Sequence, residues 1–144
     1  MKDYNAPFFS LYENLFIVLK EEYGEAKTLE LFGRVMQKGL KKAYDLSGFK
    51  KGDPNSFKEV LELRDNAVGL DVKFPIVNSQ QITYQFHTDP FPGLKNYVNH
   101  ELLDDTYINF KIKYLLGEGW NYKTTSHIWE GQPFTEFSIY KLKA

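Results

Sequence analysis

Residues 71–86, with the sequence DVKFPIVNSQQITYQF, hold the change of hydrophobic period that decides the fold class. Apolar side chains take every second position in 72–76, and they do so again in 82–86 after a polar turn at Asn78 and Ser79. An alternation of this kind is typical of strands with one buried face. The stretch therefore predicts two strands joined as a hairpin.

On the amino-terminal side of this hairpin the apolar residues recur every three or four positions, which indicates helices with one buried face. Asn5 is placed to cap the first helix, with Pro7 in its first turn, and Gly24 interrupts it. We expect a second helix over 25–47 and a third, shorter one over 54–69.

The carboxyl-terminal side of the hairpin holds one more helix and a second hairpin. Two prolines within 87–93 predict an irregular loop. Helical spacing then returns from position 97 or 98 to position 116. Two further strands are expected over 120–129 and 134–142, on either side of a turn at 130–133.

The order of these elements predicts the fold class. Because the hairpins make antiparallel pairs and no crossover unit repeats, we expect an α+β fold, with N-terminal helices followed by an antiparallel sheet of two hairpins and an intervening helix. The chain of 144 residues is 42% hydrophobic, which suits one domain that buries about 70% of its unfolded surface. Residues 1–144 are therefore predicted to form a single domain.

The composition of the chain narrows the classes of partner. The formal net charge is -1, from 18 basic and 19 acidic residues, so no overall field draws the chain to nucleic acid or to an anionic membrane. The absence of cysteine excludes disulfides, thiolate metal sites and a thiol nucleophile. We read neither a signal peptide nor the run of about eighteen apolar residues that a membrane span needs. We therefore expect a cytoplasmic protein that binds neither nucleic acid nor membrane.

Two histidines have a carboxylate close by in the sequence. His100 and Asp104 are four residues apart, a spacing that places two metal ligands on one helix face. A zinc site needs a third protein ligand, and the alternative is that the acids at 101–105 complement the helix dipole. We predict neither a metal nor another cofactor. His87 lies two residues from Asp89, and this pair makes a general base if it faces a cavity and a loop cap if it does not.

The final hairpin is crowded with aromatic side chains. Such side chains wall a pocket, form a dimer face or fill a core, and core packing is the simplest of these interpretations. The candidates for contact with a small ligand are Trp120, Tyr122, Trp129 and Phe137.

Three short stretches in the second half of the chain follow a family pattern. They are Asp89-Pro90, Leu102-Leu103-Asp104-Asp105 and Gly131 to Phe137. In their order and spacing they resemble the L-2-amino-thiazoline-4-carboxylic acid hydrolase family, and the likeness extends from about residue 11 to residue 142. Pro90, Asp105, Gly131 and Phe137 match the pattern outright, whereas Asp89, Leu102 and Thr135 stand where the family carries cysteine.

This resemblance implies a hydrolase that opens a cyclic carbon–nitrogen bond of a small molecule by adding water. Without the family's cysteines, the base that activates the water is expected to be Asp89 or Asp105. His87 or His100 would shuttle protons, and Thr135 would hydrogen-bond the ligand.

A second resemblance implies a function of another class. The chain is also similar to the ligand-binding domains of four-vinyl-reductase and transport-particle type, which often pair as dimers and hold apolar molecules. The alternative to a hydrolase is therefore a non-catalytic binding module for an apolar or amphipathic small molecule, assembled as a homodimer. The missing cysteines favour this alternative.

Overall fold

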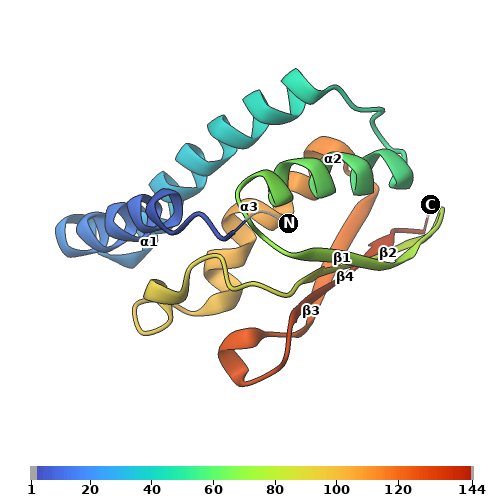
Figure 1. Ribbon diagram of the computed structural model, residues 1–144. Helices are drawn as coiled ribbons and strands as arrows, with labels where there is room; N and C mark the ends of the chain where they lie inside the picture. The colour runs from blue at the N-terminus through green and yellow to red at the C-terminus, as the bar shows by residue number, and fades with distance from the viewer. Residues whose placement is uncertain (1–2, 144) are drawn as a thin grey trace.

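A four-stranded antiparallel sheet with helices gathered over one of its faces makes up the protein (Figure 1). The computed structural model describes residues 3–143. In chain order the elements are α1 (Ala6–Ser47), α2 (Pro54–Ala67), β1 (Val72–Val77), β2 (Gln81–Phe86), η1 (Pro92–Leu94), α3 (His100–Leu115), β3 (Trp120–Ser126), η2 (Ile128–Glu130) and β4 (Thr135–Lys141). None of the helices in residues 3–143 is long and apolar enough to cross a membrane. The predicted α+β class is confirmed.

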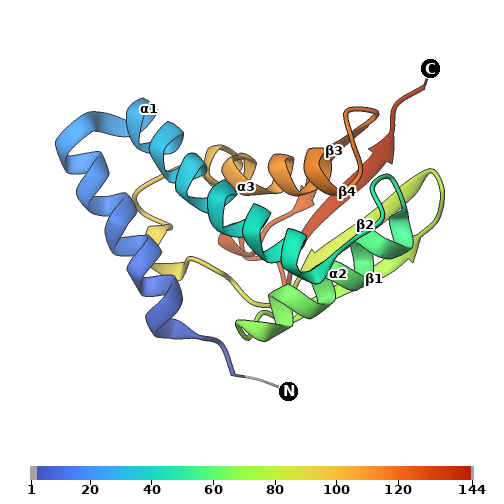
Figure 2. The same cartoon turned by 90° about the horizontal axis from the view of Figure 1, so that it is seen from above.

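Helix α1 consists of two helices that meet at a sharp kink. At Gly24 the backbone has φ 81° and ψ 174°, a conformation that is open to glycine and strained for other residues. The chain turns back there, so the two halves of α1 form a V in the view from above (Figure 2). The predicted interruption at Gly24 is confirmed. So is the Asn5 cap, whose side chain accepts a hydrogen bond from the Phe8 N–H.

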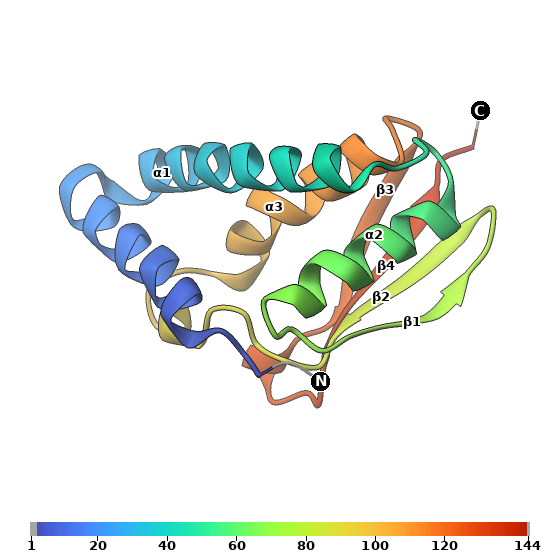
Figure 3. The same ribbon diagram turned by 45° about the horizontal axis from the view of Figure 1, so that its top comes forward.

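The second half of α1 lies along α3 (Figure 3). The two helices approach closely at Gly33, where an added Cβ would lie 3.4 Å from the Thr106 Cβ. Helix α3 begins at His100 rather than at position 97 or 98. The reason is the Asn99 cap, whose side chain accepts hydrogen bonds from the first backbone N–H groups of the helix.

The strand order of the sheet is β1-β2-β4-β3, and every neighbouring pair is antiparallel. The two predicted hairpins are therefore joined through β2 and β4, with Tyr84 opposite Phe137 in the register. β3 ends at Ser126 rather than at the predicted position 129. Just beyond it, the Thr135 Oγ1 accepts a hydrogen bond from the Ile128 N–H and holds the chain in the η2 turn.

Aromatic side chains fill much of the space between the helices and the sheet. At the centre of this core, the Tyr84 ring on β2 packs against the rings of Phe57, Phe74, Phe86 and Phe137. β2, an interior strand of the sheet, is buried along nearly its whole length. Polar groups on this strand must therefore find partners inside the protein.

Replacing Gly24 by alanine is expected to lower the free energy of unfolding by about 1–3 kcal/mol, because a Cβ strains this backbone conformation. Urea denaturation followed by circular dichroism measures the loss. Gly119→Ala is the matched control, since an added Cβ has open space at both positions but only Gly24 has a positive φ. Equal stability of the two variants would show that the kink does not depend on glycine.

Candidate functional site

Lys111 lies on the buried face of α3, and its side chain is only 4% exposed. Lysine is almost never buried this deeply without a partner. Its Nζ is 3.0 Å from the Tyr84 hydroxyl and 3.4 Å from the Asp65 Oδ1. The Tyr84 hydroxyl also donates a hydrogen bond to the second oxygen of Asp65. These three side chains, which we call the buried triad, join α3, β2 and α2.

The surroundings of the triad are aromatic and dry. The Lys111 Nζ lies 5.3–5.6 Å from the ring centroids of Tyr84, Phe86 and Tyr107. Burial lowers the pKa of Lys111 below its usual value, and the Asp65 carboxylate partly offsets this effect. Burial, reinforced by Asp65, raises the pKa of Tyr84 well above its usual value. Burial therefore disfavours the charged forms of both Lys111 and Tyr84.

A cavity of about 370 Å³ lies against this triad, and Lys111 and Asp65 are part of its wall. Both halves of α1, helix α2, the loop after β2 and helix α3 contribute to the wall. We call it the large cavity. Its apolar residues include Phe9, Tyr12, Met36, Leu40, Phe91 and Tyr107. Its charged residues are Arg64, Asp65 and Lys111.

A second, much smaller space adjoins the large cavity. It measures about 10 Å³, close to the minimum for one water molecule, and we call it the small chamber. The two spaces share the wall residues Phe86, Pro90, Phe91 and Tyr107. The polar side chains of the chamber come from Asp89, Asp104, Tyr107, His127 and Thr135.

The two carboxylates of the chamber are held by hydrogen bonds. Asp104 accepts from the His127 Nε2 at 2.9 Å and from the Tyr107 hydroxyl at 3.3 Å. Asp89 accepts from the Trp129 Nε1 at 2.7 Å and from a backbone N–H at 3.0 Å. Burial raises the pKa of Asp89 above its usual value, although these two hydrogen bonds act against the shift.

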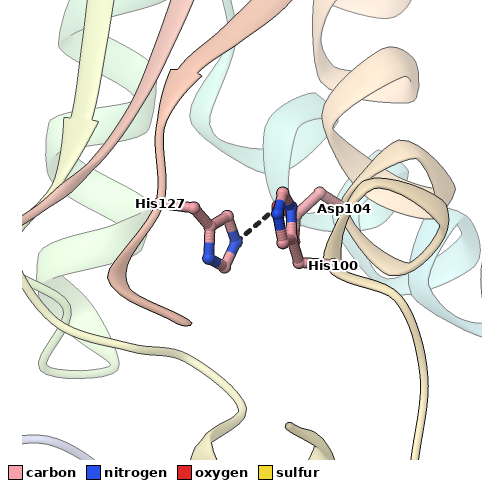
Figure 4. Close-up of side chains that lie close together, drawn as sticks. All are labelled: His100, Asp104 and His127. Atoms are coloured by element: carbon pink, nitrogen blue, oxygen red, sulfur yellow. Dashed lines mark hydrogen bonds and ion pairs between the residues drawn. The ribbon is translucent and has the colours of Figure 1, made fainter. Parts of the chain in front are cut away.

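The fold brings His127 to His100 and Asp104, so that one ligand atom from each lies within 4.8 Å of the others (Figure 4). His127 is the third potential metal ligand, which sequence spacing did not reveal. However, the two imidazole rings are stacked, with centroids 3.9 Å apart and planes 19° apart. Lone pairs lie in the ring planes, so nearly parallel rings do not aim at one ion.

The hydrogen bonds of His127 also argue against a metal site. Its Nδ1 accepts from the Trp129 N–H at 3.0 Å, which requires the proton of a neutral ring to be on Nε2. That Nε2–H donates a hydrogen bond to Asp104, so this ring nitrogen is not free to bind a metal ion. The geometry favours a hydrogen-bonded stack of side chains over a metal centre.

The structure places some of the predicted site residues together at the small chamber and places the others elsewhere. Asp89, Trp129, Thr135 and Phe137 all line the small chamber. The exposed Asp105 accepts a hydrogen bond of 2.6 Å from the Tyr122 hydroxyl, outside the residues that line either space.

The remaining predicted residues also lie outside both linings. His87 is hydrogen-bonded to Gln85 at 2.9 Å, and His100 to Glu130 at 2.7 Å. Trp120 is buried in the core, in agreement with the simpler interpretation of the aromatic hairpin.

Sequence reasoning missed Lys111 and Asp65, although a signal for Lys111 was present. Leu103, Tyr107, Lys111 and Leu115 follow one another at intervals of four, and all four are buried. A lysine within an apolar stripe of this spacing points to a paired charge in the core. Asp65 carries a comparable signal, because it follows Phe57 and Leu61 at intervals of four and all three are buried.

Comparison with models of known protein families gives no match, and comparison with curated proteins gives none either. The resemblance to the hydrolase family therefore stays a prediction from the sequence. The geometry of the two adjoining spaces is the basis for the functional argument.

The buried tyrosines predict a sharp loss of stability at alkaline pH. Burial raises the pKa of Tyr44, Tyr84 and Tyr107 well above the usual value. The unfolded chain releases these protons near pH 10 while the folded chain keeps them, so each group costs about 1.4 kcal/mol per pH unit above 10. The lowered pKa of Lys111 has the opposite sign, but its contribution stops growing near pH 10.5.

An alkaline titration that records phenolate absorbance and circular dichroism together tests this expectation. The phenolate signal of the buried tyrosines should appear with the loss of helix. The variant Tyr107→Phe should reduce the slope of stability against pH by about 1.4 kcal/mol per unit. Phenolate formation in a chain that stays folded would contradict the expectation.

Proposed function

We propose that the protein binds an amphipathic small molecule in the large cavity. The observation that carries this proposal is a space of about 370 Å³ with a mainly apolar wall and a buried lysine. Cavities that hold small molecules commonly measure about 300–1,000 Å³ and combine apolar walls with a few polar groups. The apolar body of the ligand would lie against the rings contributed by α1 and the loop after β2.

The charges of the wall define the polar end of the ligand. Arg64 and Lys111 are cationic and Asp65 is anionic, which leaves one excess positive charge. An ammonium group has three N–H donors, and Lys111 has two hydrogen-bond acceptors within the described residues. The third donor is free for an oxygen of the ligand. We therefore infer a ligand whose polar end accepts hydrogen bonds, such as a carboxylate or a carbonyl group.

Filling the large cavity should abolish binding of such a ligand. Ala43 lines the cavity, so Ala43→Trp is expected to weaken binding of decanoate by at least about ten-fold, or about 1.4 kcal/mol. Isothermal titration calorimetry measures the affinity, and circular dichroism checks that the variant is folded. Leu46→Trp is the matched control, because Leu46 lies on the same helix outside the cavity wall and is 75% exposed.

Equal affinity of the two variants, or no decanoate binding by the unmodified protein, would contradict the proposal. Native mass spectrometry of the freshly purified protein adds an independent reading. It detects a retained small molecule, and it also tests whether the chain pairs as the homodimer that the second resemblance implies.

Hydrolysis is a second candidate function, and the small chamber favours it. Asp89 lines a space that is close to the minimum for one water molecule, and that space shares wall residues with the large cavity. A carboxylate next to a held water is a suitable general base for adding that water to a carbon–nitrogen bond. The raised pKa of Asp89 brings this group closer to the range in which it exchanges protons at neutral pH.

The hydrolase candidate predicts that Asp89, rather than Asp105, is needed for turnover. Asp89→Asn should reduce hydrolysis of L-2-amino-thiazoline-4-carboxylate by at least about 100-fold, the usual contribution of a general base. Asp105→Asn is the matched control, because Asp105 is hydrogen-bonded to Tyr122 outside the chamber. Absence of turnover in the unmodified protein would remove this candidate and leave the binding function standing.

A further inference from the structure

We propose that Lys111 forms a reversible Schiff base with aldehydes that enter the large cavity. The inference rests on the proposed binding function and specifies the chemical class of its ligand. Three observations support it: the position of the amine in the cavity wall, its dry aromatic surroundings, and the proton-transfer groups beside it.

The first requirement is an amine that a bound carbonyl group can reach. The Lys111 side chain is almost closed to bulk solvent, yet it belongs to the wall of the large cavity. An apolar aldehyde would place its chain among the aromatic residues and leave its carbonyl carbon at the polar part of the wall. Binding would thus hold the two reacting groups together, which speeds a bimolecular step.

The second requirement is that the amine loses its proton. The ring faces of Tyr84, Phe86 and Tyr107 attract a cation at the Lys111 Nζ. Burial of the side chain, however, withdraws the Nζ from water, which disfavours the ammonium form. Asp65 opposes this effect, but its Oδ1 is 3.4 Å from the Nζ and its other oxygen accepts a hydrogen bond from Tyr84. Desolvation of this kind is one way in which proteins activate a nucleophilic lysine.

The third requirement is a route for protons. In the first step the neutral Lys111 nitrogen attacks the carbonyl carbon, a C–N bond forms as the C=O π bond breaks, and one amine proton passes to the carbonyl oxygen to give a carbinolamine. In the second step the C–O bond breaks, the nitrogen gives up its second proton as the C=N bond forms, and the hydroxyl group takes up a proton and leaves as water. The sum is amine plus aldehyde giving imine plus water, without oxidation or reduction. Tyr84 lies 3.0 Å from the Nζ and is hydrogen-bonded to Asp65, so this pair can accept and return the protons.

Lys113 is a matched comparison on the same helix. Its Nζ donates hydrogen bonds to the backbone oxygens of Glu118 and Trp120, and its side chain is 24% exposed. It does not belong to the wall of the large cavity. A nonspecific reaction of the aldehyde with lysine side chains would not need the cavity. It should therefore label Lys113, and the more exposed Lys27 and Lys41, at least as fast as Lys111.

The experiment is reductive trapping of the imine. The full chain is incubated with decanal and sodium cyanoborohydride near pH 7, and peptide mass spectrometry locates the decyl groups. Lys111 is expected to be labelled at least about ten-fold faster than Lys113, because binding holds the aldehyde at its amine. Excess decanoate should slow the labelling of Lys111 and leave that of Lys113 unchanged.

Two variants separate chemistry from folding. Lys111→Arg keeps a cation beside Asp65 but has no nucleophilic amine, so it should lose the preferential label; Lys111→Met tests the same loss without the charge. Circular dichroism checks that each is folded. If both fail to fold, the rate comparison within the unmodified protein still decides the outcome.

The possible results distinguish the two proposals. If decanal displaces decanoate and Lys111 is not labelled preferentially, the Schiff base is overturned and the binding function stands. If neither decanal nor decanoate binds, the binding function fails, and the Schiff base fails with it. Labelling of Lys111 that excess decanoate does not slow would also overturn the proposal, because the reaction would then take place outside the cavity.

Discussion

The ion pair between Lys111 and Asp65 is the interaction on which the arrangement of the protein depends. It connects α3 to α2, and the Tyr84 hydroxyl connects both to the central strand of the sheet. Removing two charges from water costs several kcal/mol per ion, and the cost is offset only when the partners meet with good geometry. The ion pair therefore fixes the relative positions of α3, α2 and β2, and the aromatic side chains of the core pack around these elements.

The second constraint is the kink at Gly24, because it creates the space beside that ion pair. Phe9 and Tyr12 come from the first half of α1, whereas Met36 and Leu40 come from the second, and all four face the large cavity. A continuous helix would carry the two sets of side chains along one straight axis. The cavity thus depends on a backbone conformation that only glycine adopts without strain.

The sequence was sufficient to predict the α-helices and the four strands, because their signals are local. The period of two in β1 and β2, the Asn5 cap and the break at Gly24 are each set by residues within a few positions. The predicted start of α3 and the predicted end of β3 were wrong, because side-chain contacts set them and hydrophobic periodicity carries no information on such contacts. Asn99 delays α3 with its own side chain, and Thr135 ends β3 by reaching across the hairpin to Ile128.

The candidate site was harder to predict for the same reason. Asp89 and Thr135 were selected because of a family pattern, and the fold places both at the small chamber. His127 also lines the chamber, but it is distant in sequence from its partner Asp104, and nothing near it in the chain indicates that pairing. Lys111 and Asp65 each stand out by their spacing along α3 and α2, but they are 46 positions apart, and nothing in the sequence indicates that they pair.

The strongest physical argument that the site has a function is where the buried charged and polar side chains lie, because burying them destabilises the fold. Apolar residues at both Lys111 and Asp65 would continue the buried stripes of α3 and α2, and such replacement of a whole buried ion pair is often neutral or stabilising. A fold of this architecture can therefore be built without the two charges, although in this chain each charge needs the other. Asp89, the triad and the hydroxyl of Tyr44, which has no hydrogen-bond partner within the described residues, all carry polar groups that burial penalises. Perturbed groups of this kind cluster at functional sites, and here Asp65, Lys111 and Asp89 line two spaces that share four wall residues. Stability alone gives no reason for that placement, whereas recognition of a polar end group on an apolar molecule does.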